Sequence, residues 1–419
     1  MNISVPFFRR GLAVVPVLMS TSLSSFAAET GLLDGATARL DLRNFYINDN
    51  FVGDRATKGK AEEWTQSFIL NARSGFTQGA VGFGADLLGI YSVKLDGGRG
   101  TGGTQLLPLH DNNAPASDFG RLAIAFKARA SQTDFKAGEW SPALPILASN
   151  DGRSLPQTFQ GAQLTSKEFD GLTLYGGQFW ANSPRNDASM ERMSLNGLPQ
   201  FTSDRFNFAG GQIANKDGQT MIGLWYSQLE NIYHQQYLQF RHIQPVGEWA
   251  FSTTLGYFSG GDDGRHIAGK LDNKTYSAQF SVAFEGHTVQ VGIQRVTGET
   301  GWMRVNGTSG NALASDTWNA SYDNAQERSW QVRHNYNFAA LGVPGLTLMN
   351  RYTHGNKAHV SGIQDGKEWG RDMEAGYVIQ DGSFKDLSIR WRNASMRRSY
   401  GSGSFDENDL IFFYPITIL

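Results

Sequence analysis

Apolar and polar side chains alternate strictly over residues 387–392, Leu-Ser-Ile-Arg-Trp-Arg. Successive side chains of a β-strand point to opposite faces, so the leucine, isoleucine and tryptophan of this segment share one face. The serine and the two arginines, Arg390 and Arg392, share the other face. The same period of two recurs at residues 39–43, 121–127, 276–284 and 288–294. This pattern predicts strands with one oily face and one polar or small face along the chain.

The alternating segments are about ten residues long, the length that a tilted strand needs to cross a bilayer. Mean hydropathy is −0.37, and no apolar run after the first 27 residues approaches the roughly 20 residues of a membrane helix. Aromatic residues nevertheless make up 12% of the chain, which also has 49 glycines. Strands that face lipid on one side and water on the other give this combination, because the two faces cancel in any average. A soluble β-sandwich also alternates, but it usually has shorter strands and a smaller domain.

Connections of two kinds separate the alternating segments. Asp-Gly pairs, which accept the positive φ angles of tight hairpins, stand at Asp170-Gly171, Asp217-Gly218 and Asp381-Gly382. The longer connections are rich in Gly, Asn and Asp and cover residues 97–118, 182–205, 259–273, 298–327 and 396–407. Short turns on one side and long loops on the other are typical of an outer-membrane barrel.

The sequence therefore predicts an all-β fold: a transmembrane antiparallel β-barrel of about 18 strands with an inward-folded constriction loop. A single barrel domain is expected over residues 28–419, and a barrel of this size encloses a water-filled lumen. The predicted strands cover residues 38–47, 63–74, 79–95, 119–129, 133–139, 158–167, 172–181, 206–214, 219–229, 233–243, 248–258, 274–285, 287–297, 328–338, 345–354, 371–380, 386–395 and 408–418.

The N-terminal 27 residues have the composition of a cleaved secretory signal peptide. Arg9 and Arg10 precede an apolar stretch at residues 11–19, and Ser25-Phe26-Ala27 supplies the small residues of a cleavage site. The chain has no cysteine, so thiol nucleophiles and thiolate metal sites are excluded. A formal charge of −2 does not indicate a nucleic-acid partner. These features predict export to the bacterial outer membrane.

Basic residues recur on the polar face of the predicted strands. A charge that faces lipid near the midplane costs roughly 2–4 kcal/mol, so these side chains should face the lumen. Guanidinium groups there would attract anions and offer paired donors to a carboxylate. The candidate basic ladder along the substrate path is Arg39, Arg43, Arg121, Lys127, Arg129, Arg390 and Arg392, and Arg73, Arg241, Arg333 and Arg351 lie on the same faces. Acids on these faces are expected to be fewer, with Asp41, Asp86 and Glu374 the clearest. The alternative is that the basic residues pair with loop acids and only hold the barrel wall.

One connection, residues 141–156, is too apolar and too rich in proline for an exposed flexible loop. Its leucines and its isoleucine need cover, which they would find if the loop folded into the lumen. We expect this loop to form the constriction, with Asp151, Arg153 and Ser154 as its polar tip. The alternative is a loop packed on an extracellular lid.

Three blocks of the sequence, residues 40–49, 135–179 and 371–395, resemble the OprD family of substrate-specific porins. The resemblance implies an eighteen-stranded barrel narrowed by inward-folded loops, in which a basic ladder guides carboxylates past an eyelet. Arg390 and Arg392 in RWRN and Arg43 in LDLRNFY match family motifs, whereas the other ladder residues rest on alternation. The loop LPILASNDGRSLPQTFQG, residues 144–161, resembles the branch that takes up aromatic acids such as benzoate and vanillate.

The sequence thus predicts a channel for selective passive uptake of small carboxylate-bearing solutes, without catalytic residues, cofactor or metal. The eight histidines form no HExxH motif, and GGRGTGG at residues 97–103 lacks the Lys-Ser/Thr of a phosphate loop. The alternatives are an amino-acid-selective, peptide-selective or general porin, or an outer-membrane hydrolase. The expected partners are small anionic solutes, outer-membrane lipid and lipopolysaccharide, and no nucleic acid. The sequence leaves open whether the barrel is a monomer or a homotrimer.

Overall fold

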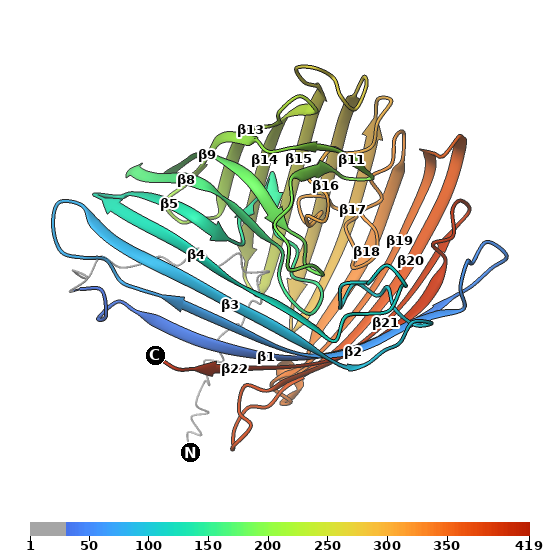
Figure 1. Cartoon of the computed structure of the whole chain (residues 1–419), viewed down its shortest axis with the longest axis horizontal. Helices are drawn as coiled ribbons and strands as arrows, with labels where there is room; N and C mark the ends of the chain where they lie inside the picture. Colours follow the sequence, from blue (N-terminus) through green and yellow to red (C-terminus); the bar gives the residue numbers. More distant parts are fainter. Residues whose placement is uncertain (1–30) are drawn as a thin grey trace, which may run out of the picture.

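The computed structural model describes residues 31–419, which form a closed antiparallel β-barrel (Figure 1). The ring is closed by β1, which pairs with both β2 and β22. Closure leaves no unpaired strand edge for lipid to satisfy. The barrel strands are β1 (Thr37–Phe51), β2 (Lys60–Arg73), β3 (Gly82–Asp96), β4 (Asp118–Ala130), β5 (Thr133–Trp140), β8 (Thr158–Phe169), β9 (Leu172–Ser183), β12 (Phe206–Ala214), β13 (Thr220–Leu229), β14 (Tyr233–Val246), β15 (Trp249–Asp262), β16 (Asp272–Phe284), β17 (His287–Thr297), β18 (Arg328–Asn337), β19 (Leu346–Val360), β20 (Ile363–Val378), β21 (Ser388–Arg398) and β22 (Phe405–Thr417). The predicted signal peptide, residues 1–27, lies outside the described residues.

The prediction of about 18 strands is confirmed, and each predicted segment overlaps one strand of the 18-stranded sheet. The largest difference is at β19 and β20. In the structure β19 ends at Val360 and β20 begins at Ile363, whereas the sequence predicted a connection over residues 355–370. The register shifts between Gly355 and Ala358, where Lys357 has a φ of +61°. The shift breaks the alternation of side chains, so the pattern no longer marked this hairpin as strand.

Short turns lie at one end of the barrel and long loops at the other. Tight connections such as residues 131–132, 170–171 and 285–286 lie on the side where β1 begins and β22 ends, which we call the turn side. At Glu285-Gly286 both residues have positive φ, as a two-residue hairpin turn requires. The opposite, loop side carries four long loops: L2 (residues 97–117), L3 (141–157), L4 (184–205) and L7 (298–327).

Smaller elements lie within these connections. L3 contains the two-residue strands β6 (Ala143–Leu144) and β7 (Leu147–Ala148), and L4 contains β10 (Met193–Leu195) and β11 (Leu198–Ser203). The 3₁₀-helix η1 (Phe338–Leu341) lies on the turn side. No helix among residues 31–419 is long and apolar enough to cross a membrane.

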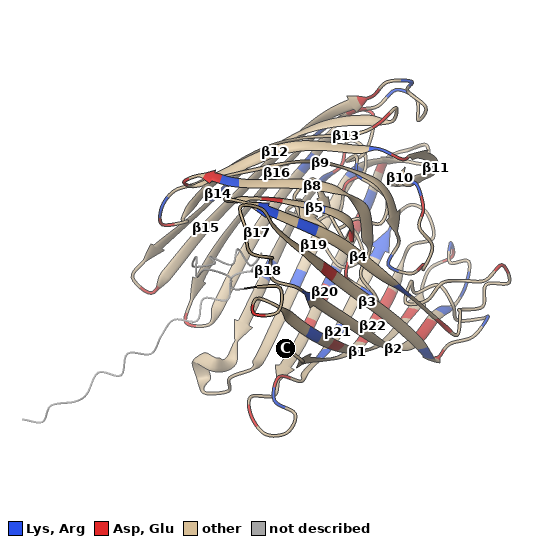
Figure 2. Ribbon diagram, turned by 60° about the vertical axis from the view of Figure 1, so that its left-hand side comes forward, with Lys and Arg blue, Asp and Glu red and all other residues tan. Residues whose placement is uncertain are grey.

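The two faces of the wall are chemically opposite, as the alternation predicted. Large apolar side chains are exposed on the outer face, including Phe126 at 69% and Leu224 at 64%. Inward-facing positions on the same wall are polar and buried, such as Ser67 and Ser92. Basic and acidic residues lie on the strands of the wall as well as in the loops (Figure 2). The buried apolar side chains gather where loops pack against the inside of the barrel.

Candidate functional site

L3 is held inside the barrel by its apolar residues. Leu144, Ile146 and Leu147 are buried with aromatic side chains of β8, β9 and β12. Further along the loop, Leu155 is buried in a second cluster with Leu106 of L2. Each such side chain contributes about 1.5–3 kcal/mol when fully buried. The predicted inward-folded loop is therefore confirmed, and the alternative of an external lid is not.

The tip of L3 is fixed to β1 by Arg43. Its Nη1 and Nη2 atoms donate to the two carboxylate oxygens of Asp151 at 2.8 and 3.0 Å. Nη1 also donates to the carbonyl oxygen of Arg153 at 2.7 Å. The Asp151 side chain is 56% exposed and the Arg43 side chain only 10%. The charge of Arg43 is therefore largely balanced by Asp151.

The other two predicted tip residues anchor the loop. Ser154 Oγ lies 2.8 Å from Thr65 Oγ1 of β2. Arg153 Nε donates to the carbonyl oxygen of Thr104 in L2 at 3.0 Å, and its Nη2 lies 4.0 Å from Glu407 Oε2 of β22. Both Ser154 and Arg153 are buried. Of the three, Asp151 alone is well exposed.

L7 reaches the wall formed by β19, β21 and β22. Asn319 Nδ2 donates to Glu407 Oε1 at 2.8 Å, and Arg351 Nη1 of β19 donates to the carbonyl oxygen of Asp316 at 3.1 Å. The carboxyl group of Asp316 accepts a hydrogen bond from Ser321 Oγ at 2.7 Å. Burial raises the pKa of this carboxyl to about 6, although the nearby arginines oppose the shift.

Trp318 of L7 lies close to two guanidinium groups. Arg392 Cζ is 4.4 Å from the centroid of its ring and Arg351 Cζ is 5.4 Å from it, within the range of cation–π contacts. The sequence analysis missed this residue because it took residues 298–327 as an ordinary polar loop. Trp302 and Met303 of L7 are buried, and such apolar residues in a loop are the signal that identified L3.

Arg390 is the arginine of this region that has no partner. Among residues 31–419 it forms no ion pair and no hydrogen bond, and its Nε atom is buried without an acceptor. Its cross-strand neighbours are Gly376 and Ile411, whose side chains accept nothing. Arg392, two residues further along β21, is paired with Glu374 at 2.5 Å. Arg390 thus keeps its donors free.

These groups lie near one another and make up the candidate constriction. Arg390 lies within electrostatic range of Arg43, Asp151 and Arg392, and Arg392 stacks on Trp318. We call Arg43, Asp151, Trp318, Arg390 and Arg392 the eyelet. It brings together the three arginines that were matched by motif, which lie on β1 and β21, the two strands that flank β22.

Arg121, another predicted ladder residue, anchors two loops. Its Nη1 and Nη2 atoms donate to the carbonyl oxygens of Asp187 in L4 and Pro156 in L3, at 2.7 and 2.9 Å. Its Nε lies 3.3 Å from Glu139, and the side chain is only 8% exposed. These contacts favour the wall-holding alternative for this residue.

The remaining ladder residues are paired with acids of the wall. The pairs are Arg39 with Asp41 at 2.8 Å, Lys127 with Asp86 at 2.8 Å and Arg129 with Asp134 at 2.6 Å. All three lie toward the turn side of the eyelet. Whether any of them contacts solute stays a prediction.

The inner wall holds more acids than the sequence analysis expected. Buried acids include Asp49, Glu63, Glu368, Asp372, Glu407 and Asp409. The sequence analysis did not identify these six acids, and whether acids are fewer than bases on these faces stays a prediction. Near the loop side both faces of a strand are polar. In β22, for example, the outward residues beside Glu407 are Asp406 and Asn408, so alternation does not show which of these residues faces the lumen. Basic residues of these faces without an acid partner among the described residues include Arg390, Arg241, Arg333 and Arg73.

A closed eighteen-stranded barrel with an oily exterior and a charged lumen narrowed by loops defines a membrane channel of the porin class. Residues 30–418 match the model of the family described as outer membrane porin, OprD family. The chain belongs to this family, as the resemblance implied. It is a bacterial outer-membrane protein and a channel rather than an enzyme. Its loop side is the extracellular side.

Relatives cover almost the whole chain. It is 57% identical to porin-like protein GalP of Pseudomonas putida over 402 residues, 96% of this chain and 97% of the relative. A crystal structure of a BenF-like porin from Pseudomonas fluorescens Pf-5 is 60% identical and superposes with a TM-score of 0.92, covering 93% of this chain and 100% of that one.

Two of the similar structures contain a ligand. OccK2 (OpdF) of Pseudomonas aeruginosa in complex with glucuronate is 56% identical, with a TM-score of 0.86 over 93% of this chain and 100% of that one. OpdK of Pseudomonas aeruginosa with vanillate is 42% identical, with a TM-score of 0.87 over 92% of this chain and 100% of that one. Both ligands are small carboxylates.

Proposed function

We propose that this porin takes up small carboxylate-bearing solutes selectively and passively, with aromatic acids such as benzoate or vanillate as the favoured class. The observation that carries the proposal is the free guanidinium group of Arg390 inside the eyelet. A guanidinium offers paired donors that fit the two oxygens of a carboxylate. The other arginines of the eyelet are already engaged, so Arg390 is the group that an entering carboxylate would bind.

The eyelet also suits a flat solute. The ring of Trp318 already packs on the guanidinium of Arg392, and arginine planes stack readily on aromatic faces. A ring that carries a carboxylate could place its charge at Arg390 and its face toward these stacked groups. The weak, multiple contacts would guide a solute without trapping it.

The ligand-bound relatives support a substrate with a carboxylate more strongly than a substrate with an aromatic ring. Vanillate and glucuronate share a carboxylate on a six-membered ring, and only vanillate is aromatic. A channel for sugar acids is therefore the second candidate, favoured by the higher identity to the glucuronate-bound protein.

Uptake by proteoliposomes across a panel of benzoate, vanillate, glucuronate, a neutral sugar and a basic amino acid tests the proposal. We expect the two aromatic acids to enter fastest and the neutral sugar slowest. Glucuronate ahead of both aromatic acids would support the second candidate. Equal entry of all five solutes would mean a general pore and would contradict both.

A further inference from the structure

The outer face of the barrel carries a row of basic residues near the extracellular end of β16, β17, β18 and β20. The row consists of Lys274, Arg295, Arg328 and Lys367, all exposed. Alternation places each of them on the lipid-facing side, because Tyr276, Ile293 and Trp330, which are two residues away on the same strands, are exposed apolar residues of that face.

Arg295 and Arg328 lie directly opposite each other in the antiparallel pair of β17 and β18. Like charges in this position destabilise a sheet. Neither arginine has an acid partner among residues 31–419, and neither do Lys274 and Lys367. Two adjacent cations without a counter-charge, held on a rigid sheet, leave a place for an external anion.

Aromatic residues fix the level of this row in the membrane. Trp330 lies one step toward the turn side of Arg328 on the same face, 5.6 Å from the ring of Tyr352 and 6.2 Å from that of His354. Tryptophan and tyrosine of membrane proteins gather where headgroups meet hydrocarbon. The basic row therefore lies at the height of the headgroups of the outer leaflet.

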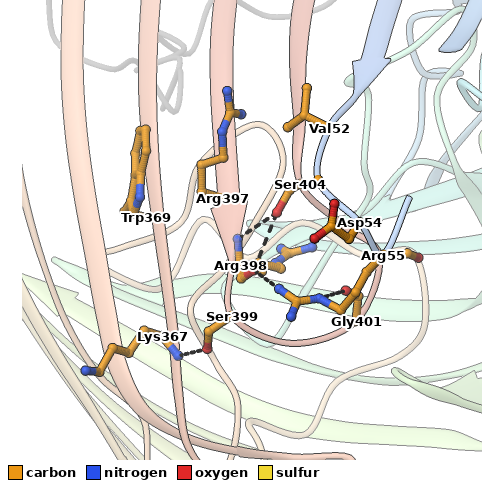
Figure 3. Close-up of a pocket in the computed structure, with 12 residues that line it drawn as sticks. Val52, Asp54, Arg55, Lys367, Trp369, Arg397, Arg398, Ser399, Gly401 and Ser404 are labelled. Atoms are coloured by element: carbon orange, nitrogen blue, oxygen red, sulfur yellow. Dashed lines mark hydrogen bonds between the residues drawn. The ribbon is translucent and has the colours of Figure 1, made fainter. Parts of the chain in front are cut away.

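The row ends at a hollow of about 450 Å³ at the rim, between β20, β21 and the loops at residues 52–59 and 399–404 (Figure 3). Trp369 of β20 stands beside Arg397 of β21 there, and Lys367 of β20 lies beside Ser399. Arg55 crosses from the first loop to the other, where it donates to the carbonyl oxygens of Gly401 and Arg398 at 3.0 and 2.8 Å. A headgroup thus has a recess beside the charged row.

Another sector of the same rim is built differently. β9, β12 and β13 contain no lysine or arginine. Their outward side chains near the extracellular end form a chain of neutral hydrogen bonds, in which Gln178 donates to Asn207 at 2.6 Å and Asn207 donates to Gln228 at 2.9 Å. The basic row is therefore confined to one sector of the barrel rather than being a general feature of its rim.

We propose that the row of Lys274, Arg295, Arg328 and Lys367 binds the phosphate groups of lipopolysaccharide in the outer leaflet, with the Arg295–Arg328 pair as its centre. A phosphate accepts bidentate hydrogen bonds from guanidinium groups. Bound between the two arginines, it would also cancel their mutual repulsion. The acyl chains would then lie along the oily face below Trp330.

Native mass spectrometry of the delipidated full barrel in detergent, titrated with purified lipopolysaccharide, tests the proposal. In the double variant Arg295→Gln/Arg328→Gln we expect binding about 30-fold weaker, since each cation near an anionic lipid surface counts for about a factor of five. The matched control is Arg192→Gln/Arg205→Gln, which removes two loop cations that have acid partners, Asp204 and Glu230. The control should bind as the unchanged protein does.

Two further measurements use the unchanged protein. Dephosphorylated lipopolysaccharide should bind at least tenfold more weakly, and inorganic phosphate alone should not compete at equal concentration, which separates the lipid from a free anion. Equal binding of the dephosphorylated form, or equal binding by the double variant and the control, overturns the proposal. The proposal is also overturned if the double variant differs from the unchanged protein only in its oligomeric state, because the row would then be a contact between barrels.

Discussion

Replacement of Arg390 by glutamine removes the one free charge of the eyelet while it keeps a polar, unbranched side chain. Because Arg390 forms no ion pair or hydrogen bond with the rest of the described chain, its loss strands no partner. We therefore expect the variant Arg390→Gln to fold and insert as the unchanged protein does. Its effect should be on permeation alone.

The size of the effect follows from the charge. A carboxylate about 4 Å from a guanidinium gains about 1 kcal/mol in water and about 4 kcal/mol at an effective dielectric constant of about 20. In a wet lumen we take about 1–2 kcal/mol, which corresponds to roughly 5–30-fold slower entry of an anionic solute. Arg392→Gln should act differently, because it leaves Glu374 without its partner and adds repulsion to the lost attraction.

The assay is uptake of radiolabelled benzoate by proteoliposomes, with the reversal potential in a salt gradient as a second readout. Arg371→Gln is the matched control: it removes the same charge from the outer face of β20, opposite the lipid-facing Tyr352. We expect reduced benzoate entry and lower anion preference in Arg390→Gln only. Unchanged uptake and reversal potential at normal insertion would refute the role of Arg390.

Three other substitutions test separate parts of the site. Trp318→Leu should lower the preference for aromatic over non-aromatic acids severalfold in the same uptake panel, and an unchanged ratio would exclude a stacking role. Arg121→Gln should destabilise the barrel by about 3 kcal/mol in urea unfolding from vesicles, because it strips a buried ion pair of one partner; a change below 1 kcal/mol would contradict the anchoring role. The raised pKa of Asp316 means that the folded protein holds a proton there more tightly than the unfolded chain, so its contribution to stability should grow as pH falls from 7 through 6 toward 4. Asp316→Asn should remove that part of the pH dependence in thermal unfolding, and an identical pH profile would show that the carboxyl does not titrate in this range.

The barrel could be predicted from the sequence because a membrane wall imposes a rule at every residue. A side chain such as Leu387 or Arg390 faces either lipid or water, and the alternation is local. The hairpin of β19 and β20 was missed because the register shift between Gly355 and Ala358 breaks this alternation.

The pairing of charges could not be predicted, because it depends on register between strands and on where loops fold. Arg43 meets Asp151, which is 108 residues away, only because L3 crosses the lumen. Arg390 and Arg392 look equivalent in the sequence, yet the register sets one against Gly376 and the other against Glu374. Trp318 gave no periodic signal, since it lies in a long polar loop with no alternation of apolar and polar residues.

L3 connects two separate parts of the barrel wall. Its apolar half packs against side chains of β8, β9 and β12. Its tip is held at β1 and β2 by contacts with Arg43 and Thr65. Different residues of L3 therefore set the width of the opening and its selectivity. The buried leucines fix how far the loop reaches into the lumen, and Asp151 and its neighbours provide the polar groups there. Because these roles are separate, a few substitutions at the tip of L3 would change which solutes pass, while the barrel and the buried part of the loop stay the same.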